Sequence, residues 1–416
     1  MRIAILQDDF PPDSFGGAGI IAFGLAQEMR RRGHEVLVLT TIRDSQYAGE
    51  FNYEGLRICR IATKYDLRFQ AYVGLWNVPV VMEVKKILST FKPDLVHAHN
   101  VHGYLSYRSI VVAKKLGAKV VLTGHDVMPF NYTKYTDFID LHEAGVPSVF
   151  HYRVNAWQQF RANRFRYNPL RNVIIRHVLR SSVDRIVAVS KALSQALNEN
   201  GIGNTRVIHN GIDAAAWTVS SQQVLEFKKK YALGDSVILF GGRLSGIKGG
   251  GKLLEAAEKL VRAFPDLQIL IVGKAGVYGE RLLKQAKKFG FQDRLIFTGW
   301  ISGPELHTAY HAATLVVTPS LCFDSFPTVN LEAFACKKSV ITTCFGGARE
   351  LVEDGVSGYV VNPYHVSMLA EKIQALLTDR KKCSAFGENG FTRVRQDFSL
   401  TAQVDAYEKL FRSLLV

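Results

Sequence analysis

The sequence has few cysteines and no spacing that would pair them. Its five cysteines are an odd number, and no two of them form a C-x-x-C motif. This argues against a disulfide framework and against a structural zinc site. We therefore expect a protein of a reducing compartment.

Long apolar runs are also missing. The chain starts MRIAILQDDF, where a short apolar run ends at Asp8 and Asp9, too early for a signal peptide. No uncharged apolar run approaches the ~20 residues that a membrane-spanning helix needs. We expect a cytoplasmic protein that does not cross a membrane.

Acidic residues are outnumbered. There are 37 Asp and Glu against 52 Lys and Arg, which gives a net charge of +15. Such an excess favours partners that carry phosphate, namely nucleic acid, an anionic membrane face or anionic small molecules, although it can also serve solubility alone.

Residues 151–180 form a strongly basic stretch. This stretch has seven arginines, no Asp or Glu, and interleaved Trp, Phe and Tyr residues. The pattern is compatible with contact to an anionic membrane surface, peripheral at its inner face, or with phosphate binding. An ordinary amphipathic helix with a solvated basic face is the alternative.

What the chain does have is a repeated strand–helix alternation. Short apolar runs such as RIAILQ, HEVLVLTT and DRIVAVS alternate with helical patterns, and the alternation restarts after about residue 210 with SVILFGGRL and LQILIVGKA. Two such blocks predict two doubly wound α/β domains. The turn signal Asn210-Gly211 marks the joint. Ligands bind at the carboxyl ends of strands in such sheets, so we expect a site in a cleft between two facing sheets.

A glycine-rich segment, GGRLSGIKGGGKLLEA, follows the first strand of the second block. Gly246 to Lys252 fit G-x-x-x-x-G-K, but Leu253 stands where a P-loop needs Ser or Thr for magnesium. Nucleotide hydrolysis is therefore disfavoured. Arg243 and Lys248 flank the turn and could bind a diphosphate together, or they could be surface charges.

The stretch PPDSFGGAGII places Gly16, Gly17 and Gly19 between the first strand and the first helix. Glycine allows close backbone approach to a ligand, and a helix N-terminus favours an anion. The spacing is not G-x-G-x-x-G, and a simple tight turn is an equal alternative.

The stretch PSLCFDSFPTVNLEAFA carries two carboxylates, Asp324 and Glu332. Pro327 suits the first position of a helix, which leaves the N–H groups of Thr328 and Val329 to face a ligand. Glu332 could accept hydrogen bonds from a ribose diol. A metal site is disfavoured because no clustered ligands are near, and the spacing does not decide whether the two carboxylates form a glycosidase pair.

Four histidines, His97, His99, His102 and His125, lie at or just after strand ends. Each one alone is more often a structural residue. His125 is the best placed to face a substrate, and a hydrogen bond to Asp126 would fix its tautomer.

These motifs together resemble the retaining glycosyltransferases with a GT-B fold, often called family 4. The resemblance covers essentially the whole chain, and its order and spacing are specific. The segments that carry it are PPDSFGGAG, RRGHEV, DLVHAHN, VVLTGHDVMPF, IVAVSKAL, VIHNGID, GGRLSGIKG, FTGW and DSFPTVNLEAFACKKSVITTCFGGARELVEDGVSGYVV.

The resemblance implies transfer of a sugar from a nucleotide-sugar to an acceptor with retained anomeric configuration and without a bound metal or other cofactor. Arg243 and Lys248 match the pair that holds the donor diphosphate. Glu332 matches the second glutamate of the E-x7-E motif, which binds the ribose. Asp324 matches the first, beside the transferred sugar, where the commoner residue is the longer Glu.

Further positions match the family in the same helix. Phe326, Thr328 and Val329 match backbone contacts to sugar and phosphate. Pro327 replaces a small glycine that is often found after the aromatic residue, which removes one backbone donor. Such variants resemble cell-surface polysaccharide enzymes.

The N-terminal block matches the family as well. Gly16 and Gly17 match the loop that closes on the donor phosphate, and His125 matches a residue near the sugar and the acceptor. The implied catalytic residues are therefore Asp324, as a positioning carboxylate, and His125.

The resemblance also implies the domain roles. Residues 1–209, with a C-terminal crossing helix at 400–416, would form an acceptor-side Rossmann-like domain, and residues 210–399 a nucleotide-sugar-binding one. The acceptor would be a glycan or a lipid-linked acceptor. The alternatives are a nucleotide-sugar epimerase of the same architecture and a non-catalytic basic membrane-binding protein; nucleic acid is not an expected partner.

Overall fold

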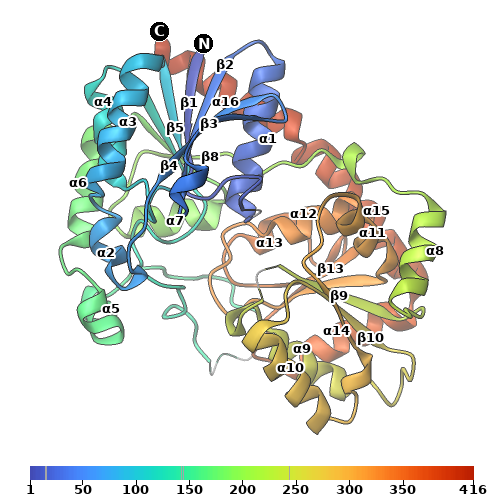
Figure 1. Ribbon diagram of the computed structural model, residues 1–416. Helices are drawn as coiled ribbons and strands as arrows, with labels where there is room; N and C mark the ends of the chain where they lie inside the picture. The colour runs from blue at the N-terminus through green and yellow to red at the C-terminus, as the bar shows by residue number, and fades with distance from the viewer. Residues whose placement is uncertain (15, 142, 144, 243) are drawn as a thin grey trace. The chain divides into compact units, whose positions relative to one another are not determined.

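A computed structural model describes the chain from residue 1 to residue 416, apart from residues 15, 142, 144 and 243 (Figure 1). The chain forms two compact units. Unit 1 comprises Met1–Phe138, His151–Asn210 and Leu400–Val416, and unit 2 comprises Ile139–Phe150 and Gly211–Ser399. Each unit is an α/β layer structure, which confirms the predicted fold class. The short segment Ile139–Phe150 belongs to unit 2, although it lies inside the range predicted for the N-terminal domain.

Unit 1 is built on one eight-stranded sheet in the order β3-β4-β2-β1-β5-β6-β7-β8. Every neighbouring pair is parallel except β3 with β4. The strands are β1 (Arg2–Leu6), β2 (Glu35–Ile42), β3 (Gly49–Tyr53), β4 (Leu56–Ala62), β5 (Leu95–Ala98), β6 (Lys119–Gly124), β7 (Arg185–Ala188) and β8 (Thr205–Val207). Their short apolar runs are buried because helices cover both faces of a parallel sheet.

The helices of unit 1 form two groups (Figure 1). The helices α3, α4 and α6 pack in that order, and α16 packs on α1. The helices are α1 (Gly17–Arg31), α2 (Gln70–Val73), α3 (Val78–Phe91), α4 (Tyr107–Lys115), α5 (Ala156–Asn163), α6 (Arg171–Ser182), α7 (Lys191–Glu199) and α16 (Leu400–Leu415).

The C-terminal helix α16 is integrated into the core of unit 1. Tyr407 and Phe411 are buried in the same hydrophobic cluster as Ile3 and Ile5 of β1. Arg32, just after α1, bonds Asp405 and Glu408. The apolar stripe of α16 therefore completes a layer that the N-terminal residues alone leave open.

Unit 2 is built on six parallel strands in the order β11-β10-β9-β12-β13-β14. The strands are β9 (Val237–Gly241), β10 (Gln268–Val272), β11 (Leu295–Gly299), β12 (Leu315–Thr318), β13 (Ser339–Thr343) and β14 (Gly358–Val361). Counted along the unit, this is the order 3-2-1-4-5-6 of dinucleotide-binding folds. The strand order reverses between β9 and β12, which makes that point the expected ligand site.

The helices of unit 2 cover both faces of its sheet. They are α8 (Ser221–Lys230), α9 (Gly250–Glu258), α10 (Gly276–Lys288), α11 (Gly303–Ala312), α12 (Thr328–Ala335), α13 (Ala348–Leu351), α14 (Val366–Thr378) and α15 (Arg380–Asp397). In β9, Ile238, Leu239 and Phe240 are all buried. Each such side chain contributes roughly 1.5–3 kcal/mol by leaving water, so the strand that ends at the switch point is firmly held.

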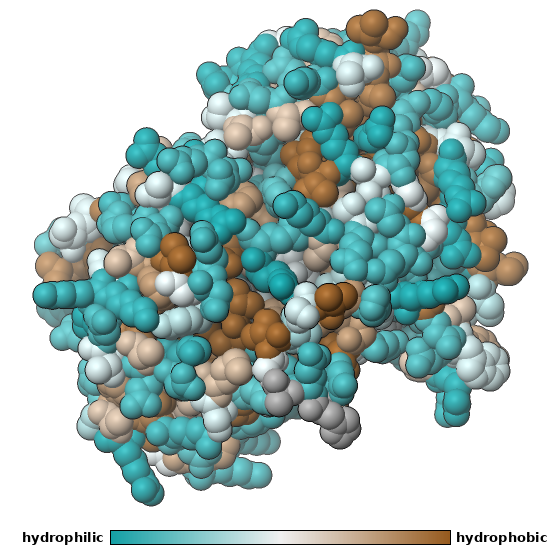
Figure 2. Space-filling view, turned by 180° about the vertical axis from the view of Figure 1, so that it is seen from behind, coloured by the Kyte–Doolittle hydropathy of each residue, from teal (hydrophilic) through white to brown (hydrophobic). Residues whose placement is uncertain are grey.

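The surface seen in Figure 2 is mostly hydrophilic, with hydrophobic side chains in separate patches between charged and polar ones. Among the described residues, no helix combines the length and the apolar character that crossing a bilayer requires.

Candidate active site

The switch point of unit 2 brings together two charged residues that are far apart in the sequence. The short 3-10 helix Gly246–Lys248 follows β9, and Asp324 follows β12. Lys248 Nζ lies 2.7 Å from Asp324 Oδ2, and Ser320 Oγ donates to the same oxygen at 2.9 Å. The carboxylate is mostly buried, with a side-chain exposure of 12%. Two residues that the resemblance assigns to diphosphate and sugar thus lie in direct contact.

The close packing of the two loops requires glycine. Gly249 has φ +81°, and a Cβ there would lie 1.8 Å from the carbonyl oxygen of Pro319. The N–H of Leu321 donates to the carbonyl of Ile247 at 2.7 Å. The glycine-rich segment therefore serves to bring Lys248 against the loop that carries Asp324.

The backbone of Asp324 is held by the loop after β13. Its N–H donates to the carbonyl of Phe345, and its carbonyl accepts from Gly347 N–H at 2.8 Å. Gly346 has φ +82°, and a Cβ there would lie 2.4 Å from the Asp324 carbonyl oxygen. Asp324 is thus fixed from both sides before any ligand arrives, as positioning requires.

Helix α12 begins beside this carboxylate. Pro327 is its N-cap, one position earlier than the predicted role as first helical residue, and no side chain caps the helix. The first N–H groups of a helix have no acceptor within it, so those of Thr328 and Val329 suit an anion. Phe326 is buried, with its ring 5.6 Å from that of Phe398.

A buried polar network fixes α12 against the sheet. Asn330 bonds Thr318 at 2.8 Å and Thr342 at 3.0 Å, and the two threonines bond each other at 2.9 Å. Thr318 and Thr342 belong to neighbouring strands β12 and β13. The start of α12 therefore has a fixed place at the edge of the sheet, since every member of the network has a partner.

Glu332 lies in α12 and does not carry an ordinary solvated charge. The hydroxyl of Tyr310, in α11, donates to Glu332 Oε2. Burial raises the pKa of Glu332 above its ordinary value, and hydrogen bonds from Tyr310 and the Thr328 side chain oppose that shift. The arrangement presents a carboxylate of fixed orientation, as binding a sugar diol needs.

The predicted residues Gly16 and Gly17 stand at the start of α1 in unit 1. Gly16 is the N-cap, with an ordinary extended backbone at φ −68°, and Gly17 is the first helical residue. Gly19, in the first turn of α1, has a steric requirement, since a Cβ there would lie 2.5 Å from the carbonyl oxygen of Asp9. Gly19 holds the helix close to the loop after β1.

His125 follows β6, and its partner is a second histidine. His125 Nε2 lies 2.8 Å from His99 Nδ1, and the rings stack with centroids 5.1 Å apart. The predicted hydrogen bond from His125 to Asp126 is wrong: Asp126 accepts from Met128 N–H at 2.9 Å, and its Oδ2 lies 3.6 Å from His102 Nε2. The Asp126 carboxylate therefore bonds the backbone of its own turn and faces His102.

The environment keeps His125 neutral near pH 7. Burial lowers its pKa to about 4, the nearby Asp126 raises it, and His102 lowers it. A neutral imidazole can donate at one nitrogen and accept at the other. Because one nitrogen is bonded to His99, the other remains for a substrate group.

Three residues of these sites do not stand out in the sequence as site residues: Tyr310, Ser320 and His99. Tyr310 lies in a helix where one more aromatic residue suggests only core packing, and Ser320 is a common loop residue. A lone histidine at a strand end, such as His99, is more often structural. Arg243, predicted to contact the diphosphate, lies outside the described residues.

Among the described residues, no group of three or more His, Cys, Asp or Glu side chains has the geometry to hold a metal ion.

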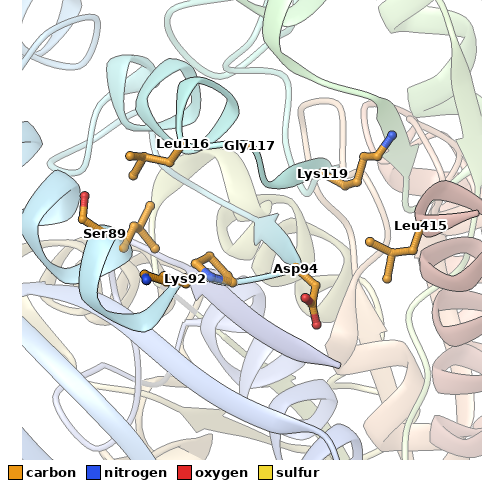
Figure 3. A pocket seen from close by; sticks show the side chains of 9 residues that line it. Ser89, Lys92, Asp94, Leu116, Gly117, Lys119 and Leu415 are labelled. Carbon is orange, nitrogen blue, oxygen red and sulfur yellow. The ribbon is translucent and has the colours of Figure 1, made fainter.

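A hollow of about 520 Å³ opens elsewhere on unit 1 (Figure 3). Asp94 and Lys119 line it just before β5 and at the start of β6, with Ser89, Lys92 and Leu415 around them. It lies at the amino ends of the strands, whereas ligands of open α/β sheets bind at the carboxyl ends. It does not coincide with any predicted site.

The arginine-rich stretch 151–180 divides into different roles. Arg171 is buried, donates to the carbonyl of Met128 at 2.6 Å, and lies 5.6 Å from the Tyr132 ring. Arg176 and Arg180 donate to the carbonyls of Asn200 and Gly201, just beyond α7. Arg153, Arg161, Arg164 and Arg166 are exposed on its N-terminal side, and Arg180 is exposed at its other end.

Comparison with known proteins gives two family matches. A family model described as glycosyltransferase family 4 matches residues 15–216, and one described as glycosyl transferases group 1 matches residues 221–393. Between them they account for most of both units.

Curated relatives span nearly the whole chain. The chain is 25% identical to a glycogen synthase of Mycobacterium tuberculosis over 97% of this chain and 94% of that protein. It is 26% identical to the O-antigen chain mannosyltransferase C of Escherichia coli over 100% of this chain and 99% of that protein.

Solved structures share the two-domain architecture. Anabaena HepE in complex with UDP-glucose has a TM-score of 0.75 and 21% identity, covering 99% of this chain and 100% of that chain. The sucrose-phosphate synthase of Thermosynechococcus elongatus has a TM-score of 0.78 and 20% identity, covering 99% and 98%. These likenesses confirm the predicted fold.

Proposed function

Because the chain belongs to the GT-B glycosyltransferases of family 4 and group 1, we propose that it transfers a sugar, with retention of configuration, from a nucleotide-diphospho-sugar to a glycan or lipid-linked acceptor. The observation that carries this proposal is the contact of Lys248 with Asp324 at the switch point of unit 2, beside the start of α12. Relatives named for glycogen and O-antigen chains favour a role in polysaccharide synthesis, and the resemblance of the Asp324–Thr328 segment to cell-surface polysaccharide enzymes leads us to propose that the product is of that kind.

The donor diphosphate would bind at Lys248, with Arg243 as its expected second cation. The N–H groups of Thr328 and Val329 at the start of α12 would add donors of fixed direction. Charge grows on the diphosphate as the bond to the sugar breaks, so these groups stabilise the transition state more than the ground state. Lys248 would exchange part of its interaction with Asp324 for the phosphate.

The nucleoside would be held through Glu332. An ionised carboxylate accepts hydrogen bonds from the two hydroxyls of a ribose. Tyr310 and Thr328 orient it, so little conformational freedom is lost on binding.

The transferred sugar would lie beside Asp324. Asp324 would accept hydrogen bonds from sugar hydroxyls and hold the ring for departure of the diphosphate. Its Lys248 and Ser320 contacts limit its motion, so we assign it positioning rather than nucleophilic attack. His125, neutral at pH 7, would bond a hydroxyl of the sugar or acceptor.

We propose that the reaction needs no metal, because Lys248, Arg243 and the helix N-terminus supply positive potential where a metal ion would otherwise stand. Transfer should then persist after dialysis against a chelator. Loss of activity on chelation, with recovery on adding magnesium or manganese, would contradict this part.

The central test combines donor binding with product analysis. UDP-, GDP- and ADP-sugars are screened for a rise in melting temperature, and the product anomer is then determined by NMR. Asp324→Asn should keep donor binding but lose transfer, whereas Asp324→Glu should keep part of the activity. Full transfer by Asp324→Asn with unchanged donor binding would overturn the role of Asp324.

Two alternatives have their own readouts. An epimerase of the same architecture would convert the donor sugar without any acceptor, so incubation of the donor alone separates the two enzymes. A non-catalytic membrane-binding protein would show no donor-induced stabilisation.

For the enzyme we propose a cytoplasmic location, peripheral at the inner face of the membrane, with residues 151–180 contributing to membrane contact.

A further inference from the structure

Exposed hydrophobic side chains of unit 1 gather in two stretches of the chain. The first stretch holds Leu67, Phe69, Tyr72, Trp76, Val78 and Met82. The second holds Trp157, Phe165, Leu170, Val173 and Ile174. Together they make up nearly half of the exposed large hydrophobic residues among the described part of the chain. Such clustering points to a contact surface, because single exposed apolar residues are normally scattered.

The exposure is large for these residue types. The Phe165 side chain is 90% exposed, and Met82, Trp157 and Trp76 are 66%, 63% and 59% exposed. Aromatic residues are costly to leave in water, since each has about 150–250 Å² to bury. A partner that removes them from water would therefore gain affinity.

The two stretches are neighbours in the fold. The hydroxyl of Tyr72, in α2, donates to the carbonyl of Phe165 at 3.3 Å. Figure 1 shows α2 and α5 next to each other at one end of the layer that contains α3, α4 and α6. We call residues 67–82 and 157–174 together the docking face.

Basic side chains border the exposed aromatic residues. Arg164 and Arg166 flank Phe165, and Arg161 lies one turn earlier; all three are exposed. The guanidinium of Arg108 lies 5.3 Å from the centre of the Trp76 ring. The second stretch contains no acid, so its charge is unopposed within the segment.

We propose that the docking face lies on an anionic bilayer, with its aromatic and aliphatic side chains between the headgroups and its arginines at the lipid phosphates. Trp, Tyr and Phe prefer the membrane–water interface, and Arg extends its charge to the phosphates from an apolar stem. This extends the membrane contact proposed for residues 151–180 to a second segment, and it adds apolar insertion to charge attraction.

Charge favours a bilayer over a second copy of the chain. In a symmetric dimer the same patch meets itself, which would set Arg161, Arg164 and Arg166 against their own copies. An anionic bilayer offers phosphates to the arginines and an apolar layer to the aromatic residues at once. The proposed function enters here at one point only: membrane contact would bring the enzyme to a lipid-linked acceptor.

The test is sedimentation of the full chain with two kinds of vesicle, neutral phosphatidylcholine alone and phosphatidylcholine mixed with phosphatidylglycerol. Wild type should bind the anionic vesicles and should bind the neutral ones much more weakly. Trp76→Ser with Phe165→Ser should weaken the partition coefficient by about tenfold or more, because two inserted aromatic residues are removed. Arg161→Gln with Arg164→Gln and Arg166→Gln should remove most of the preference for anionic vesicles.

The matched control is Leu225→Ser with Val277→Ser, two residues of unit 2 with similar exposure, 62% and 70%. This control should bind vesicles as wild type does. All the altered side chains are exposed, so an unchanged melting temperature shows that each variant is folded.

Three results would overturn the proposal. They are equal binding of wild type and the Trp76/Phe165 variant, binding that ignores vesicle charge, and a dimer in solution that the same two substitutions dissociate. Transfer to a soluble acceptor is measured in parallel. Vesicle binding without transfer would support the docking face and contradict the proposed enzyme activity. Transfer without vesicle binding would support the enzyme activity and contradict the docking face.

Discussion

The two sheets share a strand order around their switch points, yet they carry opposite chemistry there. In unit 2 the strand ends present Lys248, partly exposed, next to Asp324. In unit 1 the loop after β1 presents Asp8, which is buried and accepts hydrogen bonds from the N–H groups of Gly103, Tyr104 and Leu105. The topology supplies a place for a ligand, and the side chains decide which ligand is suited to it.

The two sites differ in what their charged side chains contact. The unit 2 site keeps a cation and a helix N-terminus for an anionic ligand. The unit 1 site uses its carboxylate on its own backbone and leaves the neutral pair His99 and His125. We therefore expect unit 2 to bind its ligand through charged groups and unit 1 to bind its ligand through hydrogen bonds from uncharged groups.

The largest effect should come from the cation of unit 2. Lys248→Ala should lower kcat about 100- to 1,000-fold, because it removes charge stabilisation of the leaving diphosphate. Steady-state kinetics with a donor that stabilises the protein measures this. Lys252→Ala is the control, since Lys252 pairs with Glu255 at 2.8 Å in the same segment. Equal losses in both variants would contradict a specific role for Lys248.

The next largest effect should come from the support of Glu332. Tyr310→Phe removes the hydroxyl that orients the carboxylate, so KM for the donor should rise about tenfold while kcat changes less. The variant should also lose part of its preference for ribonucleotides over 2′-deoxy and 3′-deoxy nucleotides. A purely structural role would leave that preference intact.

The control for this experiment is Tyr359→Phe, a substitution at another buried tyrosine of unit 2, in β14. It should keep both KM and the ribose preference. The pH dependence gives a second readout. Because burial raises the pKa of Glu332, donor binding should weaken on acidification at a higher pH than for an ordinary glutamate, and Tyr310→Phe should move that midpoint higher still.

At Asp8 of unit 1 the expected effect is on stability rather than catalysis. Burial raises the pKa of Asp8 to about 6, while the charge of His102 and the three backbone hydrogen bonds lower it. Because the folded pKa is above the unfolded value of 3.8, this contribution to the unfolding free energy is complete below the unfolded pKa. It is lost as the pH rises through about 6, by up to about 3 kcal/mol.

Asp8→Asn tests this contribution, since asparagine does not titrate. Urea unfolding at about pH 4 and pH 7 should show a smaller change between the two conditions than wild type shows. The variant should also be less stable at both, because its amide presents an N–H₂ group to backbone donors. An identical pH slope in the two proteins would show that Asp8 does not titrate as described.

The smallest effect should come from the histidine pair. His99→Phe keeps a ring against His97 but removes the hydrogen bond to His125, so kcat should fall only a few-fold. Since the pKa of His125 is about 4, wild-type kcat should show no titration of this histidine between about pH 6 and 8. A break in that range that disappears in His125→Gln would contradict a neutral His125.

The fold was largely predictable from the sequence, and the site only in part. Runs such as VILF in β9 and LVVT in β12 are strands because buried parallel strands read as continuous apolar runs. Motif spacing and the family resemblance predicted Asp324, Glu332 and Lys248 as site residues, and the structure brings Lys248 and Asp324 into contact. Tyr310 and Ser320 were not found, because a side chain that acts by orienting another has no spacing of its own.

The basic stretch 151–180 shows a similar limit on what a pattern of charged residues can predict. Seven arginines in 151–180 predicted a basic surface. Arg171 is instead buried against Met128 and Tyr132, and Arg176, partly buried, donates to a carbonyl beyond α7. A count of charges cannot separate an arginine that faces solvent from one that satisfies backbone acceptors.

The sequence by itself determined the strand–helix alternation, the two-domain class and the family, since these depend on local periodicity and on motif order. It also placed the two carboxylates eight positions apart in one segment. Only the tertiary structure decided that Asp324 is fixed by Lys248 and that Glu332 is oriented by Tyr310. These contacts join strands and helices far apart in the chain, and only packing brings such groups within hydrogen-bonding distance.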